Sequence, residues 1–198
     1  MSKIASSFPS IILASSSIVR KQQLIDANIP FEIIISDADE TPDESKTFKD
    51  QLAEISMRKA LTVLEATKNR GKRVIIAADQ NLMFNEKMYG KPKSIDDARK
   101  LLHKMKGSEE IYSYTGNSVL LADGKKILQS INITDTAKLC VDSISDEEIE
   151  NYLMNNPCLS FCGGISILYS SFVHLKEGRL STAKGLTLEY ALEMISNI

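Results

Sequence analysis

The first half of the chain alternates between short apolar runs and stretches with helical periodicity, and this alternation restricts the possible fold more than any other feature. Ile11–Ala14, Phe31–Ile35 and Val74–Ala78 are short apolar runs that end in polar residues, so we predict that each is a buried strand. From Thr47 onward, apolar residues recur with a period near 3.6, which predicts a long helix. Strands that alternate with helices are typical of an α/β protein.

The helical segments are recognised by their start signals and their apolar faces. Ser94 is expected to cap a helix over Ile95–Lys106, and Ser145 begins a capping box before a helix that ends near Asn155. A further helix follows the first apolar run, and a last one begins at about Leu186. The positions expected to face the core are Leu24 and Ile25 of the helix after the first run, and Phe48, Leu52, Ile55, Leu61 and Leu64 of the long helix.

The second half of the chain has longer strand-like segments. Ile111–Ala122 and Lys125–Val141 are predicted strands, and the Asp-Gly pair between them is typical of a hairpin turn. A shorter hairpin is expected over Leu82–Met88, and Ser170–Lys176 is expected to be a strand. Adding hairpins to alternating strands and helices predicts an α/β fold with a mixed sheet flanked by helices, in a single domain over residues 1–198.

Composition excludes several classes of protein. The 198 residues carry 24 Lys and Arg against 26 Asp and Glu, which argues against a nucleic-acid-binding protein that relies on positive charge. No run approaches the roughly 18 apolar residues of a membrane span. The apolar run Ile11–Ala14 is too short for a signal peptide, so we expect a cytoplasmic protein that does not bind membranes. The cysteine count of 3 is odd and too low for a disulfide scaffold of this size, so we expect reduced thiols.

The first candidate binding segment lies where the first predicted strand meets the following helix. Ser15 and Ser17 place hydroxyl groups beside the free N–H groups of a helix start, where the helix dipole favours anions. Arg20 lies one turn further on, where its guanidinium would reach the same phosphate. A serine-rich helix start with a solvated arginine is the alternative interpretation.

An acidic segment follows the second predicted strand. Asp37, Asp39 and Glu40 would repel one another unless they are solvated or share a metal ion, so they form either an acidic surface turn or part of a metal site. An apolar strand followed by Asp-x-Asp-x-Thr also resembles haloacid-dehalogenase-type phosphatases, in which Asp37 would be the nucleophile and Asp39 the acid–base group. That family needs a later acidic pair at a strand end, and Val74–Ala78 is followed by one acid only, Asp79.

Asp79 and Lys91 are the candidates of the third segment. Burying a carboxylate without a partner costs several kcal/mol, so Asp79 after so apolar a run is expected to belong to a site or to cap a nearby loop. Gly90 and Pro92 flank Lys91 and restrict the loop, so Lys91 is expected either to face a phosphate or to be solvated. Strand ends of this kind are where α/β sheets bind ligands.

Taken in order, these segments resemble the Maf family, the septum-formation-inhibitor-like nucleoside triphosphate pyrophosphatases. The ordered set consists of Leu-Ala-Ser-x-Ser-x-x-Arg near the N-terminus, Asp-x-Asp-Glu, Lys59-Ala60 in a helix, Ala-Asp-Gln after a strand, and Gly-Lys-Pro. The likeness continues through Tyr114-Thr115-Gly116, Ser145-x-x-Glu148-Ile149-x-x-Tyr152 and Gly185-Leu186. No single motif is specific, but the order of the set over nearly the whole chain is.

The resemblance implies hydrolysis of a nucleoside triphosphate to the monophosphate and pyrophosphate, in a cleft between two lobes of an elongated mixed sheet (a Maf/ITPase-like fold). It implies that Asp79 is the catalytic group that accepts a proton from water, and that Glu40 and Asp79 hold a divalent metal cation, Mg²⁺ or Mn²⁺. The residues that match positions around the phosphates are Ser15, Ser17, Arg20, Lys59 and Lys91. Cations and a metal ion would screen the negative charges that otherwise repel attacking water. A homodimer is usual in such families.

The positions that tune base specificity in the family correspond here to Val19, Gln80 and Leu168. Asp-Gln resembles the subgroup that acts on 7-methyl-GTP rather than the subgroup that prefers dTTP and UTP. However, Val19 stands in place of that subgroup's aromatic residue and Leu168 in place of its acidic residue. Because a leucine cannot hydrogen-bond a base edge, we expect weaker discrimination between bases, or discrimination by shape, and a substrate range that includes modified nucleotides.

Two other functions are open at this point. The first is the phosphatase described above, which would release orthophosphate from a monoester and depend on Asp37. The second is a non-catalytic nucleotide-binding regulator of cell division, a role attached to the family's name. Such a regulator would bind nucleotide without turning it over.

Overall fold

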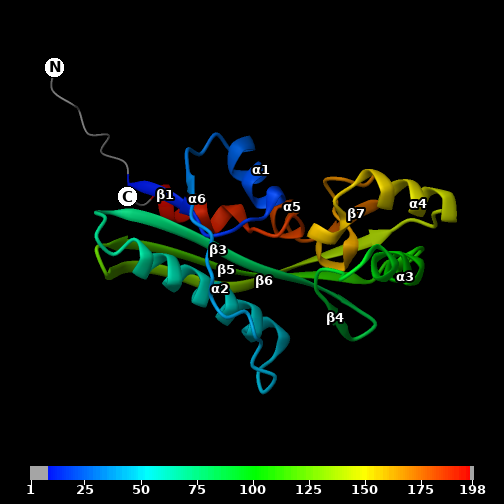
Figure 1. Ribbon diagram of the computed structural model, residues 1–198, viewed down its shortest axis with the longest axis horizontal. Coiled ribbons are helices and arrows are strands. Elements are labelled where there is room, and N and C mark those ends of the chain that lie inside the picture. Colours follow the sequence, from blue (N-terminus) through cyan, green and yellow to red (C-terminus); the bar gives the residue numbers. More distant parts are fainter. Residues whose placement is uncertain (1–8, 197–198) are drawn as a thin grey trace.

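A mixed sheet of seven strands forms the centre of the computed structural model, which describes residues 9–196 (Figure 1). β1 (Ser10–Leu13) pairs in parallel with β2 (Glu32–Ile33) and with β3 (Arg73–Phe84). The remaining strands pair antiparallel, in the sheet order β2-β1-β3-β5-β6-β7 with β4 on the end of β3. Their bounds are Lys87–Tyr89 for β4, Ile111–Asp123 for β5, Lys126–Val141 for β6 and Val173–Glu177 for β7. The predicted mixed sheet is confirmed.

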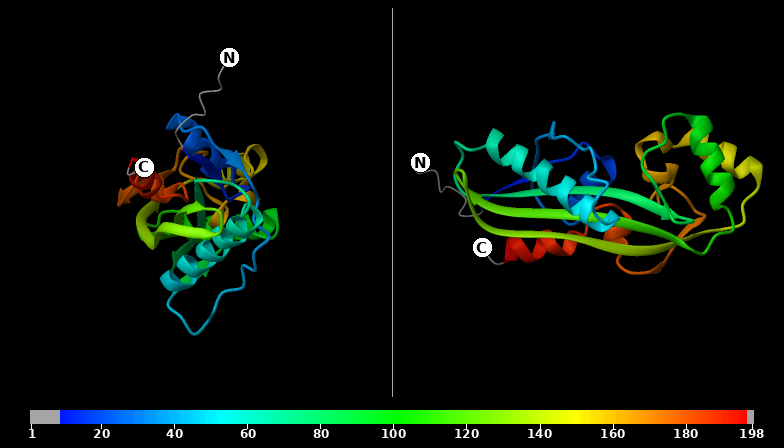
Figure 2. Two further views of the ribbon diagram at one scale, coloured as in Figure 1. Left: turned by 90° about the vertical axis from the view of Figure 1, so that its left-hand side faces the viewer. Right: turned by 90° about the horizontal axis from the view of Figure 1, so that it is seen from below.

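The helices form two groups along the long axis of the sheet, which Figure 2 shows from below. One group flanks both faces of the half of the sheet that contains the parallel strands, and it consists of α1 (Ile18–Asp26), α2 (Phe48–Ala66), α5 (Leu180–Ala183) and α6 (Leu188–Ser196). The other lies at the far end and consists of α3 (Ile95–Met105), α4 (Asp146–Asn155) and two short 3₁₀ turns, Cys158–Ser160 and Cys162–Gly164. No helix within residues 9–196 is long and apolar enough to cross a membrane.

Both faces of β3 are buried because helices cover both sides of the sheet. Val74 and Ile76 pack with residues of α1 and α6, whereas Ile75 and Ala77 pack under α2. Successive side chains of a strand point to opposite faces, so a strand that is covered on both sides requires a continuous apolar run. This requirement explains the run Val74–Ala78, in which every residue is fully buried.

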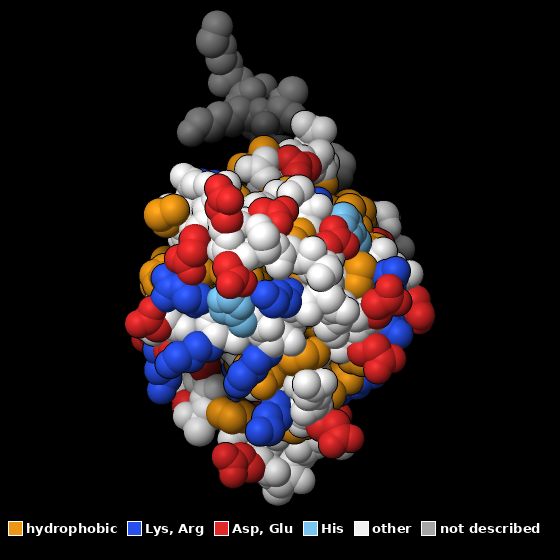
Figure 3. All heavy atoms as spheres, turned by 90° about the vertical axis from the view of Figure 1, so that its right-hand side faces the viewer, with side chains coloured by type: hydrophobic (Ala, Val, Ile, Leu, Met, Phe, Trp, Pro, Cys, Tyr) orange, Lys and Arg blue, Asp and Glu red, His pale blue; other side chains and the backbone are white. Residues whose placement is uncertain are grey.

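A separate apolar core joins α3 and α4 to the far end of the sheet, with Leu102, Met105 and Ile149 fully buried in it. Figure 3 views this end of the molecule and shows acidic and basic side chains interspersed over it. Arg99 of α3 pairs there with Glu150 of α4. The first group of helices thus covers two apolar clusters, one on each face of the sheet, and the second group covers this third cluster. The two groups correspond to the two predicted lobes.

β3 is longer than the sequence indicates. It was expected to end at Ala78, but it continues through Asp79 and Gln80 to Phe84, and Asp79 lies opposite Gly116 of β5 in the register. Polar residues after an apolar run were interpreted as the end of the strand. In the structure, backbone pairing with β5 continues past them, so Asp79 projects from the middle of a strand whose backbone is held by β5.

Some predicted core positions are wrong. Ile25 is 46% exposed, and Phe48 and Leu61 are each 41% exposed. In α1 the buried residues are Val19, Gln23 and Leu24, and Ile25 lies roughly 100° round the helix from Leu24. β2 is also shorter than Phe31–Ile35, β7 begins later than Ser170, and α5 and the two 3₁₀ turns were not expected.

Arg73 is fully buried and holds the end of α2 against the turn between β5 and β6. Its guanidinium donates to the Thr67 hydroxyl at 2.8 Å, to the carbonyls of Leu64, Arg70 and Gly71, and to the carbonyl of Gly124 at 2.8 Å. All five acceptors are neutral oxygen atoms. The buried charge is therefore compensated by hydrogen bonds to oxygen atoms that point toward the guanidinium, and not by a carboxylate.

We expect Arg73→Met to lower the free energy of unfolding by about 3 kcal/mol, because it leaves several buried acceptors without donors. Urea denaturation followed by circular dichroism measures the change. The matched control is Arg70→Met, which removes a half-exposed ion pair with Glu32 and should cost less than about 1 kcal/mol. Equal losses in the two variants would contradict the role of Arg73.

Candidate active site

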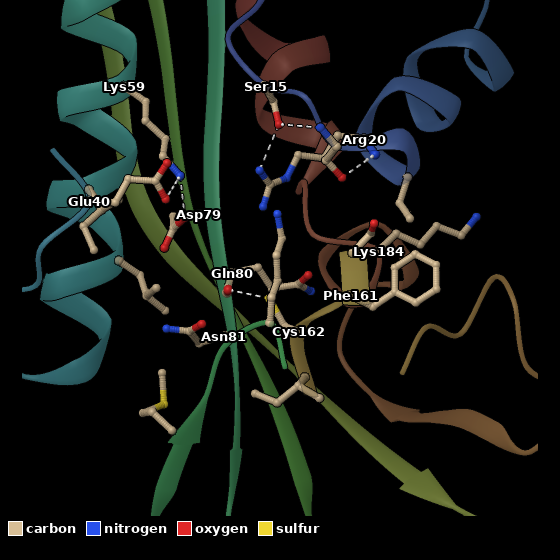
Figure 4. A pocket seen from close by; sticks show the side chains of 18 of the residues that line it. Ser15, Arg20, Glu40, Lys59, Asp79, Gln80, Asn81, Phe161, Cys162 and Lys184 are labelled. Carbon is tan, nitrogen blue, oxygen red and sulfur yellow. Dashed lines mark hydrogen bonds and ion pairs between the residues drawn. The ribbon is translucent and has the colours of Figure 1, made fainter. Parts of the chain in front are cut away.

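A cavity of about 900 Å³ opens beside the middle of β3, between the two groups of helices (Figure 4). Its walls come from the start of α1, the loop after β2, α2, β3, the segment around the second 3₁₀ turn and the end of α5. The predicted site residues that line it are Ser15, Ser17, Val19, Arg20, Glu40, Lys59, Asp79, Gln80 and Lys91. Segments far apart in the sequence therefore converge on one cavity.

Two carboxylates share one ammonium group in the cavity. Lys59 Nζ lies 2.6 Å from Asp79 Oδ1 and 2.8 Å from Glu40 Oε2. The side chain of Lys59 is 10% exposed and that of Asp79 is 17% exposed, whereas Glu40 is largely exposed. We refer to Lys59, Asp79 and Glu40 as the carboxylate cluster. No hydrogen bond from residues 9–196 engages Oδ2 of Asp79, so this oxygen is available to water or a metal ion.

Gly116 allows α2 to approach the sheet closely enough to form the carboxylate cluster. A Cβ atom at Gly116 would lie 2.2 Å from the carbonyl oxygen of Leu52 in α2. Gly116 is also the residue opposite Asp79 in the β3–β5 register. The absence of a side chain at this position therefore brings α2, and Lys59 with it, directly over Asp79.

Arg20 connects three segments of the cavity wall. Its Nε donates to the carbonyl of Gly185 at 2.6 Å, and its Nη1 donates to the carbonyl of Ala78 at 2.8 Å and to the Ser15 hydroxyl at 3.1 Å. Ser17 caps α1 by accepting from the backbone N–H of Arg20. Burial lowers the pKa of Arg20, but a guanidinium remains charged. Within residues 9–196 only Nη2 lacks a hydrogen bond, so the guanidinium offers one nitrogen to a ligand rather than the predicted fork.

Gln80 uses its amide group inside the protein. Its Nε2 donates to the Ser113 hydroxyl at 2.8 Å and to the carbonyl of Ala183 at 3.1 Å. The backbone carbonyl of Gln80 accepts from Cys162 Sγ at 2.8 Å, and burial raises the pKa of that thiol to about 11, so it stays protonated at neutral pH. Gln80 thus connects the end of α5 to β3, in addition to any contribution to base selection.

The cavity wall does not include Leu168, Asp37 or Asp39, which the sequence singled out. Leu168 is 40% exposed and lies outside the lining residues, and its proposed effect on base specificity stays a prediction. Asp37, the nucleophile of the phosphatase alternative, is exposed and also absent from the cavity wall. Asp39 pairs with Arg58, and hydrogen bonds from Thr41 lower its pKa.

Sequence reasoning missed several residues of the cavity wall, among them Phe161, Cys162 and Lys184 (Figure 4). The first two belong to the unexpected 3₁₀ segment, where no periodic pattern marks a site. Lys184 follows the short helix α5 and precedes Gly185. Gly185 belongs to the motifs of the family resemblance, and its position next to Lys184 was the only sequence feature that could have drawn attention to this lysine.

The carboxylate cluster fits a divalent cation that a substrate helps to bind. Mg²⁺ in nucleotide sites is held by one or two carboxylates together with phosphate oxygens and water. Glu40 and Asp79 supply two carboxylates that converge on one point, which Lys59 Nζ now contacts. No group of three or more His, Cys, Asp or Glu within residues 9–196 forms a complete metal site, so the remaining ligands would come from the phosphates and water.

The fold and the cavity define an α/β protein whose cavity combines a helix start, several cations and a carboxylate pair, an arrangement suited to a polyanionic ligand. The family model described as "Maf-like protein" matches residues 10–198. The chain therefore belongs to the Maf family, as the ordered motifs predicted.

Among curated proteins, the chain is similar to three that are named dTTP/UTP pyrophosphatase. That of Caldanaerobacter subterraneus subsp. tengcongensis is 29% identical over 187 residues, covering 93% of this chain and 87% of the relative. Those of Bdellovibrio bacteriovorus and Bacillus cereus are each 28% identical, covering 95% and 90% of this chain and 98% and 90% of the relatives. Among solved structures, the Staphylococcus aureus Ham1 protein aligns with a TM-score of 0.48 and 13% identity, over 96% of this chain and 100% of that one.

Proposed function

We propose that this chain hydrolyses nucleoside triphosphates to the nucleoside monophosphate and pyrophosphate. The observation that carries the proposal is the carboxylate cluster, in which Asp79 and Glu40 converge on Lys59 in a cavity that also contains Arg20 and Lys91. Membership of the Maf family and relatives named dTTP/UTP pyrophosphatase support it.

The proposed reaction needs a base, charge screening and a fixed triphosphate. Water attacks phosphorus at the anhydride between the α- and β-phosphates, its proton passes to the Asp79 carboxylate, and the bonding electron pair leaves with the pyrophosphate oxygen. Backbone pairing between β3 and β5 holds Asp79 in place, so its carboxylate can accept the proton without a rearrangement of the backbone. Lys59, Arg20 and Lys91 bring positive charge to the phosphates.

We further propose that Glu40 and Asp79 hold a divalent cation, Mg²⁺ or Mn²⁺, when the triphosphate is bound. Such a cation supplies charge neutralisation and orientation of the phosphates. The exposed side chain of Glu40, on the loop after β2, can leave Lys59 for the metal without disturbing a core.

The substrate range should include modified as well as standard bases. Val19 is apolar, and the amide nitrogen of Gln80 already donates to Ser113 and Ala183. These two positions therefore leave few free hydrogen-bond donors for a base edge, and discrimination would depend on the shape of the cavity.

A screen of the purified protein tests this function. Standard and methylated nucleoside triphosphates are incubated with Mg²⁺ or Mn²⁺, and pyrophosphate and orthophosphate are measured separately. We expect pyrophosphate with at least one triphosphate and complete loss of turnover in EDTA, restored by added metal. Orthophosphate as the only product would contradict the proposal, and tight nucleotide binding without turnover would favour the regulator instead. Undiminished turnover in EDTA would contradict only the proposed divalent cation and would leave the proposed hydrolysis standing.

A further inference from the structure

Glu40 lies on the loop between β2 and α2, which has no regular structure from residue 34 to residue 43. Residues 39–47 of this loop are all exposed. From residue 36 to residue 45, the hydrogen bonds and ion pairs that reach other elements of the described chain (9–196) all go to Arg58 and Lys59 of α2. These two neighbouring residues therefore supply the polar contacts that hold Glu40 beside the cavity.

Arg58 contacts the residues on either side of Glu40. Its Nη2 donates to the carbonyl of Thr41 at 2.6 Å, and its Nη1 lies 3.7 Å from Oδ2 of Asp39. Asp39 and Thr41 are also bonded to each other, because the backbone N–H of Thr41 donates to Asp39 Oδ1 at 2.9 Å. Glu40 is therefore the middle residue of a turn formed by residues 39–41, and the Arg58 guanidinium contacts both of its ends. We refer to residues 39–41 as the Glu40 turn.

The stronger of the two Arg58 contacts is the one to the backbone of the turn. Asp39 is 71% exposed, and an exposed ion pair contributes little. The side chain of Arg58 is 29% exposed, and its Nε is buried without a hydrogen-bond partner among residues 9–196. Because the guanidinium is partly withdrawn from water, its hydrogen bond to the Thr41 carbonyl is stronger than the same bond at the surface.

The contacts of Lys59 and Arg58 differ in what happens to them when a cation binds. Lys59 holds Glu40 through the Glu40 carboxylate itself, at 2.8 Å. That contact is lost when the carboxylate turns to a divalent cation, as proposed above. The Arg58 contacts go to Asp39 and Thr41 and do not use the Glu40 side chain, so they persist when it turns.

Helix α2 also fixes the Glu40 turn relative to Asp79. The helix lies directly against β5 at Gly116, where a Cβ atom would be 2.2 Å from the carbonyl oxygen of Leu52. Gly116 is opposite Asp79 in the register of β3 and β5. A turn that Arg58 attaches to α2 is therefore held at a set place relative to the Asp79 carboxylate.

We propose that Arg58 is a positioning residue, which holds the Glu40 turn against α2 so that the Glu40 carboxylate faces a divalent cation at the carboxylate cluster. Arg58 is outside the cavity wall, so it acts through Glu40. A ligand that is already in place loses less conformational freedom when the cation binds, which raises the affinity. This inference rests on the proposed function, which includes the divalent cation.

The motion of the turn is measured first, in the metal-free protein and without substrate. We expect Arg58→Met to lower the NMR order parameters of the Glu40 and Thr41 amides from about 0.85 to below about 0.6, because the turn loses its contact with α2. Arg99→Met is the matched control. Arg99 is 33% exposed and also contacts two acids, but it lies on α3 in the other group of helices, so its loss should leave both amides unchanged.

Calorimetric titration with α,β-methylene-UTP, which cannot be hydrolysed between its α- and β-phosphates, measures the effect on the cation. The ratio of the affinities in Mn²⁺ and in EDTA gives the contribution of the metal. We expect Arg58→Met to lower this ratio about tenfold, the scale on which a partner of a metal ligand acts, and to leave the affinity in EDTA within twofold. Arg58→Lys should lose less, because an ammonium group can still reach the Thr41 carbonyl. In a Glu40→Gln background, Arg58→Met should cost nothing more.

Unchanged order parameters, or an unchanged ratio, in a folded Arg58→Met protein would overturn the inference. An equal loss in the Glu40→Gln background would do the same, because Arg58 would then not act through Glu40. A thermal melt shows whether each variant is folded, and Arg58→Lys supplies the comparison if Arg58→Met is not. The proposed cation fails separately: a wild-type protein that binds the analogue equally well in Mn²⁺ and in EDTA would refute the cation and the role of Arg58 toward it, whereas the proposed hydrolysis is decided by the product screen.

Discussion

Asp79→Asn is expected to lower the rate of pyrophosphate release by about 10³-fold, the scale of a general base in hydrolysis. The amide cannot accept the proton of the attacking water, although its oxygen can still accept the hydrogen bond that Lys59 donates at 2.6 Å. Since Asn has the same size and the β3–β5 pairing does not involve the side chain, the melting temperature should stay within about 3 °C of wild type.

The control for this prediction is Asp37→Asn. Asp37 is exposed and outside the cavity, so its amide variant should hydrolyse triphosphates at the wild-type rate. The pair of variants also separates two mechanisms, because a phosphatase with Asp37 as nucleophile would lose activity in Asp37→Asn and retain it in Asp79→Asn. Full turnover by a folded Asp79→Asn protein would remove this carboxylate from the reaction.

Local signals in the sequence predicted the starts of helices correctly because capping involves neighbouring residues. Thr47, Ser94 and Ser145 each accept from the backbone three residues on, and Ser145 forms the expected capping box with Glu148. The β5–β6 hairpin follows from its Asp-Gly turn in the same way. These interactions need no information about the rest of the fold.

The strand that carries Asp79 shows the limit of such signals. Whether β3 ends at Ala78 or continues to Phe84 depends on pairing with β5, whose residues lie far along the chain. The cavity also depends on residues that are far apart in the chain, because Arg20 donates to Gly185 across a separation of 165 residues. The ordered motifs brought Arg20 and Asp79 into one site through family resemblance. Lys184 has no such motif, and only the folded chain reveals its place in the wall.

Arg20 joins three segments of the cavity wall, and Arg20→Lys should lower kcat/KM by about 100-fold while keeping the charge. A lysine ammonium cannot donate at once to Gly185, Ala78 and Ser15 as the guanidinium does. Two or three buried acceptors would lose their donor, so we also expect the melting temperature to fall by roughly 5 °C. Steady-state kinetics and calorimetry measure the two effects. Arg70→Lys, at an exposed pair with Glu32, should change neither.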